Sequence, residues 1–187
     1  MTESLPFATA MRKVAGYGLA EFLEIVSELS QESTKKGALD RRMKELISLG
    51  LALSKRCHRC IDIHGREAAR TGASAGEIEQ VRRIVLYMNA TPDTADAMRA
   101  SWADSWRDYA RHRGPLKNYE RELVALAVSI QRQRSEQLDL HARAALTAGA
   151  TPEQVAEVLP ITLLMDGAPA LSQIPRVMQV IESTVGG

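Results

Sequence analysis

Hydrophobic residues recur along the chain at the three- and four-residue intervals of amphipathic helices, and the alternating pattern of strands is nearly absent. Glycines and prolines separate the apolar segments. Thr151 before Pro152 is typical of a helix start, and Gly72 and Gly149 suit the left-handed conformation in which many helices end. We therefore predict an all-α fold, with helices at about 15–33, 40–54, 57–71, 75–90, 93–112, 117–132, 135–148, 152–165 and 168–183.

The chain also repeats itself after 77 residues, because residues 39–81 align without a gap on residues 116–158. The alignment pairs Glu45 with Glu122, His64 with His141, Met88 with Met165 and Pro92 with Pro169. Self-similarity at a fixed period indicates a duplicated structural unit. We therefore predict two fused repeats in one compact domain, the first at residues 1–91 and the second at residues 92–187.

Only two cysteines occur, Cys57 and Cys60, and both lie in the first repeat. A disulfide between them would close too short a loop to stabilise the fold much. The first residues, MTESLPFATAM, contain an early acid and no basic stretch before an apolar core, so we expect no secretion signal. In such a chain the spacing indicates a redox or metal site. The second repeat has Arg134 and Gln137 at these positions, which predicts a packing role for it.

Cys57, Cys60 and His64 are spaced i, i+3 and i+7, which places them on one face of a helix, while His58 falls on another face. We expect Ser54 to cap this helix, so that Cys57 lies in its first turn. The free amides of a first turn, together with the two basic residues before Cys57, favour a thiolate. This is the environment that a reactive cysteine needs.

Glu45 precedes Cys57 by 12 residues, which is about 18 Å along one unbroken helix. Its carboxylate reaches the thiols only if the chain folds back near residues 54–56, and it would then form a proton relay with His64. Both residues recur in the thiol-free second repeat, so they are also candidates for a structural pair. The stripe of Trp102, Trp106 and Tyr109 is more typical of a core or a subunit interface than of a binding site.

The pattern of Glu45, eleven residues, Cys57, two residues, Cys60, three residues and His64 resembles the motif of the alkylhydroperoxidase D branch of the carboxymuconolactone decarboxylase-like family. The segment ARTGASAGEIEQV that follows is also similar to the family's continuation. Alkylhydroperoxidase D itself has a histidine directly before the second cysteine, where this chain has Arg59. The resemblance implies a helical bundle of two fused repeats with the alkylhydroperoxidase D-like fold.

The resemblance further implies a peroxidase or disulfide reductase that acts on alkyl hydroperoxides. Cys60 would attack the peroxide, Cys57 would resolve the product to a disulfide, and Glu45 with His64 would relay the proton. Thioredoxin-like sites instead use the first cysteine as the nucleophile, so the order of attack stays open. The expected partners are an organic hydroperoxide, a thiol or dithiol reductant and further copies of this chain, and we expect no cofactor.

Three alternatives remain open from the sequence. One is carboxymuconolactone-type decarboxylation, which needs no thiol pair, and a second is a redox-sensing or interaction module without turnover. The third is a metal site that uses the two cysteines, His58 and His64. The net charge of +1 gives no reason to expect a nucleic-acid or membrane partner, and no apolar run approaches the roughly 20 residues of a membrane span. We expect a cytoplasmic protein.

Overall fold

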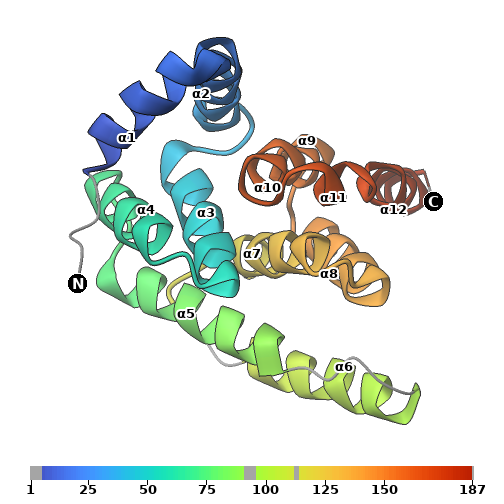
Figure 1. The fold of residues 1–187 in the computed structure, drawn as a ribbon. Coiled ribbons are helices and arrows are strands. Elements are labelled where there is room, and N and C mark those ends of the chain that lie inside the picture. Colours follow the sequence, from blue (N-terminus) through green and yellow to red (C-terminus); the bar gives the residue numbers. More distant parts are fainter. Residues whose placement is uncertain (1–5, 91–95, 112–113, 187) are drawn as a thin grey trace. The chain divides into compact units, whose positions relative to one another are not determined.

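A computed structural model describes residues 6–90, 96–111 and 114–186, and these residues form helices and turns without a strand. They divide into two units, Met1–Lys35 and Lys36–Gly187. The first unit contains α1 (Phe7–Val14), the π-helical turn η1 (Ala15–Leu19) and α2 (Ala20–Thr34). The second contains α3 (Arg41–Lys55), α4 (His58–Arg70), α5 (Ala75–Ala90), α6 (Asp96–Arg111), α7 (Asn118–Gln131), α8 (Ser135–Thr147), α9 (Pro152–Ala156), α10 (Val158–Asp166), α11 (Ala168–Leu171) and α12 (Ile174–Val185) (Figure 1).

The first unit differs from its prediction at the start of the expected helix 15–33, whose end agrees with that of α2. Helix α1 was not predicted, and the expected helix is interrupted near its start, where Tyr17 and Gly18 leave helical geometry. Gly18 has a φ of 88°, a left-handed conformation that glycine adopts without steric cost. The kink therefore separates α2 from the short helical segments before it.

The second unit confirms the predicted repeat in its helical hairpins, α3–α4 and α7–α8. Arg56 and Gln133 occupy the same place in the two turns, 77 residues apart, and both have a φ of 56°. The amides that follow them bond equivalent carbonyls, Cys57 to Ala52 and Arg134 to Ser129, at 3.0 Å in each case. Gly72 and Gly149 end α4 and α8 with φ values of 100° and 101°. The predicted all-α bundle of two fused repeats is thus confirmed.

Two predicted helices of the second repeat are each divided in the structure, and proline explains both divisions. Helix α9 ends at Ala156, four residues before Pro160, and α11 ends at Leu171, four residues before Pro175. A proline has no amide hydrogen to donate to the carbonyl four residues earlier, so a helix cannot continue undisturbed through that position. The equivalent positions of the first repeat carry no proline, and α5 is continuous. The start of the predicted helix 93–112 and the predicted repeat boundary at 91 and 92 lie outside the described residues.

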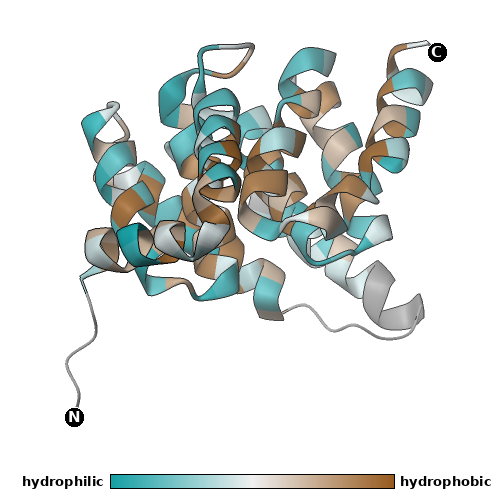
Figure 2. Cartoon of the chain, turned by 45° about the horizontal axis from the view of Figure 1, so that its top comes forward, coloured by the Kyte–Doolittle hydropathy of each residue, from teal (hydrophilic) through white to brown (hydrophobic). Residues whose placement is uncertain are grey.

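The core of the second unit is built around α3 and α7, the first helices of the two hairpins. Both are buried along most of their length, and α7 is buried from Glu120 to Gln131. They cross closely at Gly50, where an added Cβ would lie 3.0 Å from the side chain of Val124. In Figure 2 the ribbon is coloured by hydropathy, and hydrophobic and hydrophilic residues alternate along the helices. Within the described residues, every helix is too short or too polar to cross a bilayer.

Candidate functional site

The turn between α3 and α4 positions the two cysteines. Arg56 takes the left-handed conformation that ends α3, and Cys57 becomes the N-cap of α4. The Sγ of Cys57 accepts a hydrogen bond from the amide of Cys60 at 3.4 Å. The prediction that Ser54 caps α4 is therefore wrong, because its hydroxyl lies 3.4 Å from Oδ1 of Asn89 instead. The reason is that α3 runs to Lys55, which leaves Ser54 inside it.

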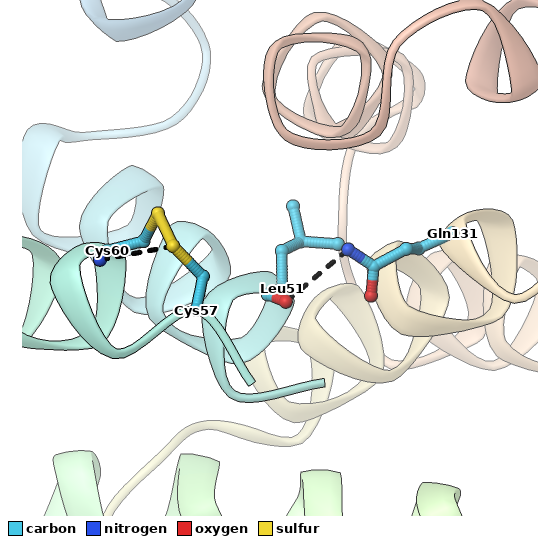
Figure 3. The surroundings of a disulfide bond; sticks show 4 residues. All are labelled: Leu51, Cys57, Cys60 and Gln131. Atoms are coloured by element: carbon cyan, nitrogen blue, oxygen red, sulfur yellow. Dashed lines mark hydrogen bonds between the residues drawn. A yellow bond between two sulfur atoms is a disulfide. The ribbon is translucent and has the colours of Figure 1, made fainter. Parts of the chain in front are cut away.

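Cys57 and Cys60 are joined by a disulfide, with their Cα atoms 5.3 Å apart (Figure 3). Both cysteines are partly exposed. The N–H group that donates this hydrogen bond to Cys57 Sγ belongs to the first turn of α4, where the free N–H groups carry partial positive charge. In the reduced protein the same bond would favour negative charge on Cys57.

The chain folds back at this turn as expected and brings Glu45 of α3 to His64 of α4. Oε2 of Glu45 lies 2.8 Å from Nδ1 of His64, and the glutamate side chain is only 1% exposed. The histidine side chain is 15% exposed. His64 follows Cys60 by one helical turn, a spacing at which Cβ atoms are about 5–6 Å apart. The four predicted residues therefore surround one site, with the carboxylate buried and the two cysteines partly exposed.

Arg41 is a site residue that the sequence interpretation missed. Its guanidinium lies 2.7 Å from Oε1 of Glu45, so the two carboxylate oxygens have separate partners, Arg41 and His64. The i, i+4 spacing of Arg41 and Glu45 on α3 was the signal that could have identified it. The positive charge of Arg41 offsets part of the cost of burying the carboxylate.

The second repeat contains an equivalent pair in a closed environment. Nδ1 of His141 lies 2.8 Å from Oε2 of Glu122, the same distance as in the first repeat. Here the imidazole is fully buried, and Trp102 and Trp106 pack edge-on against it. Nε1 of Trp106 also donates to the second oxygen of Glu122 at 3.3 Å. Trp106 is thus part of the core, with Trp102 and Tyr109 partly buried beside it, and the two tryptophans cover the imidazole of the second Glu–His pair.

Among the described residues, no three histidine, cysteine, aspartate or glutamate side chains are arranged to hold a metal ion. Asp139, the repeat equivalent of Asp62, forms an ion pair with Arg176 of α12 at 2.7 and 2.8 Å. The disulfide of Cys57 and Cys60 can take part in thiol–disulfide exchange, with His64 and the buried carboxylate of Glu45 on the same hairpin.

Comparison with known proteins agrees with the duplicated hairpin. The model of the carboxymuconolactone decarboxylase family matches the chain twice, at residues 20–103 and 100–179. An uncharacterised protein of Cupriavidus necator is 32% identical over 68 residues, which span 36% of this chain and 60% of that protein. The uncharacterized protein 4 in the cox locus of Paracoccus denitrificans is 31% identical over 97 residues, or 52% of this chain and 87% of that protein. The chain belongs to the carboxymuconolactone decarboxylase family.

Proposed function

We propose that this chain is a thiol-dependent peroxidase that reduces organic hydroperoxides through Cys57 and Cys60. The observation that carries the proposal is a partly exposed cysteine pair whose second member, Cys60, lies one helical turn from a histidine that contacts a buried carboxylate. The family match supports it, because the resemblance to alkylhydroperoxidase D concerns the same four residues. The second repeat lacks thiols and its histidine is buried, so the proposed chemistry belongs to the first repeat alone.

The proposed reaction begins with the reduced pair. The thiolate of Cys60 attacks one oxygen of the hydroperoxide, the O–O bond breaks, and the alkoxide leaves as an alcohol after taking up a proton. Cys60 is then a sulfenic acid. The thiol of Cys57 attacks its sulfur, which releases water and forms the disulfide. The balance is one dithiol and one hydroperoxide giving one disulfide, one alcohol and one water.

His64 is assigned the proton transfers because of its position. Its Nδ1 faces Glu45, which fixes the ring and leaves Nε2 as the nitrogen that can exchange a proton with Cys60 or with the leaving alkoxide. Arg41 holds the other carboxylate oxygen and so keeps Glu45 in place. We assign Cys57 the resolving role because its sulfur accepts a hydrogen bond from the first turn of α4. This bond stabilises the Cys57 thiolate, which makes Cys57 a good leaving group when the reductant attacks the disulfide.

The cycle requires a thiol or dithiol reductant, since nothing in the two steps above regenerates the thiols. A reductant of this kind is available in the cytoplasm, which is where we place the protein. We further propose that copies of the chain associate, by analogy with the family. The reaction as proposed uses no cofactor, because electrons pass directly between sulfur and oxygen.

The experiment is to add one equivalent of an organic hydroperoxide, such as cumene hydroperoxide, to the reduced protein and follow intact mass and free thiols over seconds. We expect a loss of two hydrogens and of both thiols. Cys57→Ser should stop at a Cys60 sulfenic acid, with a mass one oxygen higher, and Cys60→Ser should keep its thiol. Two thiols that persist for many minutes in the native chain would refute peroxidase activity toward this substrate.

The family match also favours a second candidate, lactone decarboxylation, which is the reaction in the family's name. This reaction needs acid–base groups such as Glu45 and His64 but no thiol pair. A Cys57→Ser, Cys60→Ser double variant discriminates between the two, because decarboxylation of a carboxylated muconolactone would survive it and peroxide reduction would not. Full lactone turnover by the double variant would replace the peroxidase proposal.

A further inference from the structure

Arg56 is the charged residue that directly precedes the disulfide. It stands before Cys57 in the turn between α3 and α4, and it is exposed to solvent. Its φ of 56° lies in the left-handed region, which glycine adopts at the least steric cost. The equivalent turn of the second repeat has Gln133 with the same φ, so this backbone needs no charge at that position. The positive charge therefore occurs with the thiols and is not required by the turn.

The other acidic and basic side chains between residues 55 and 70 leave little net charge. Three pairs of opposite charge are present, two as ion pairs and one by its i, i+4 spacing on α4: Lys55 with Asp166, Arg70 with Glu67, and Arg66 with Asp62. Arg59 makes an interaction of its own. The carboxyl end of α3 and the amino end of α4 meet in this turn, and their opposite partial charges offset each other. Arg56 forms no ion pair within the described residues, so it adds one positive charge beside the disulfide.

We propose that Arg56 determines which reductant the disulfide accepts, and that this reductant is a thiol with negative charge beside its sulfur. A thiol reduces a disulfide in its thiolate form, so the attacking group is already an anion. A carboxylate near that thiolate adds a second negative charge, and Arg56 attracts this charge as well. The role rests on the proposed function, because the peroxidase cycle is what requires a reductant.

The reduction consists of two exchange steps. The reductant's thiolate attacks Sγ of Cys60, the S–S bond breaks, and Cys57 leaves as a thiolate. A second thiol then attacks the reductant's sulfur in the mixed disulfide and releases Cys60. Two thiols thus become one disulfide, and their two electrons and two protons pass to Cys57 and Cys60. Arg56 forms none of these bonds, and its charge acts on the approach of the anionic reductant.

The test starts from the full chain oxidised with diamide and measures its reduction at low ionic strength by 3-mercaptopropionate, 2-mercaptoethanol and cysteamine. Samples are quenched with acid, alkylated and weighed by mass spectrometry. Each thiol is compared with itself in the native chain and in Arg56→Gln, so its intrinsic nucleophilicity cancels. Unit charges about 10 Å apart in water change a rate about twofold, and the anionic and cationic probes differ by two charges. The preference for 3-mercaptopropionate over cysteamine should therefore fall about fourfold in Arg56→Gln, and an unchanged preference would overturn the proposal.

Two controls separate a local effect from general charge attraction. Arg143→Gln removes the same charge from an exposed position of α8, on the other hairpin, and should leave the preference unchanged. An equal fall in both variants would refute the role of Arg56. In the native chain, raising the ionic strength from about 10 mM to about 0.5 M should slow 3-mercaptopropionate and not cysteamine. This measurement needs no variant, and an equal response of the two probes would also refute the proposal.

Glutathione and reduced thioredoxin distinguish the two sources of such a thiol, a small molecule and a protein. The reductant that loses more of its rate in Arg56→Gln identifies the source, and no loss with either would overturn the proposal. The disulfide is formed with diamide and not with a hydroperoxide. The result therefore does not depend on peroxidase activity, and a failure here leaves the proposed function to its own test.

Discussion

Replacing each histidine of the two Glu–His pairs by phenylalanine separates a catalytic role from a structural one. Phenylalanine keeps a planar aromatic ring at the position and removes both nitrogens, so each change deletes a contact of 2.8 Å to a buried carboxylate. The two pairs have the same geometry but different surroundings, which makes His141→Phe the matched control for His64→Phe. We expect opposite results from the two variants.

His64→Phe should reduce the rate of peroxide-driven disulfide formation by about 10²–10⁴-fold, the usual loss when a general acid–base group is removed. Its effect on stability should be small, because the site is partly open and Glu45 keeps the ion pair with Arg41. The rate is measured as loss of free thiols after mixing reduced protein with cumene hydroperoxide. Stability is measured by thermal unfolding of the same samples.

His141→Phe should leave that rate within twofold and lower the stability. Glu122 would lose its partner at 2.8 Å and keep only Nε1 of Trp106 at 3.3 Å and the more distant Arg121 at 3.8 Å. A buried charged group deprived of a partner costs on the order of 3 kcal/mol. For a chain of this size that corresponds to a fall in Tm of roughly 6–12 °C. An unchanged rate in His64→Phe, or an equal loss of rate in both variants, would refute the proposed relay.

Three further predictions concern the core, the two tyrosines Tyr87 and Tyr109 that pack against Trp106, and the second repeat. Gly50→Val should lower the free energy of unfolding by about 1–3 kcal/mol in chemical denaturation, because a Cβ added at Gly50 would lie 3.0 Å from the side chain of Val124 on α7. Burial raises the pKa of Tyr87 and of Tyr109, so the unfolded chain ionises first and stability should fall as pH rises above about 10, which melting curves at pH 8–11 would detect. Arg134→Cys with Gln137→Cys, in a chain lacking the native cysteines, should form a disulfide with a mild oxidant but show no rapid reaction with hydroperoxide.

The helical hairpins and the meeting of Glu45 with His64 were predictable because both follow from local rules. The 77-residue repeat and the spacing of apolar residues determine the hairpins, and an antiparallel hairpin is the only short connection that brings these two residues together. The breaks before Pro160 and Pro175 could also have been predicted, because a proline beyond the first turn of a helix leaves the carbonyl four residues earlier without its donor. They were missed because the helices 152–165 and 168–183 were predicted from the spacing of apolar residues, which continues through both prolines.

Other features of the site depend on contacts that spacing does not reveal. The left-handed turn falls on Arg56 rather than on a glycine, so nothing in the composition marked the end of α3 or the capping role of Cys57. The closing of the second Glu–His pair depends on Trp106 of α6, which lies outside the aligned segments. Long-range packing of this kind becomes visible only once the helices are placed.

The two Glu–His pairs have the same geometry, which indicates that the primary role of each pair is to link the two helices of its hairpin by a contact between the side chains. Glu122 and His141 retain the 2.8 Å contact although their repeat has no thiols and no solvent access. The pair alone therefore does not make a reactive site. The first repeat differs because it combines the same pair with Cys57 as the N-cap of α4 and with a partly exposed histidine. In the second repeat the aromatic side chains of α6 cover the equivalent histidine, His141. On this reasoning, duplication preserved the hairpin joint in both repeats, and only one repeat combines it with thiols.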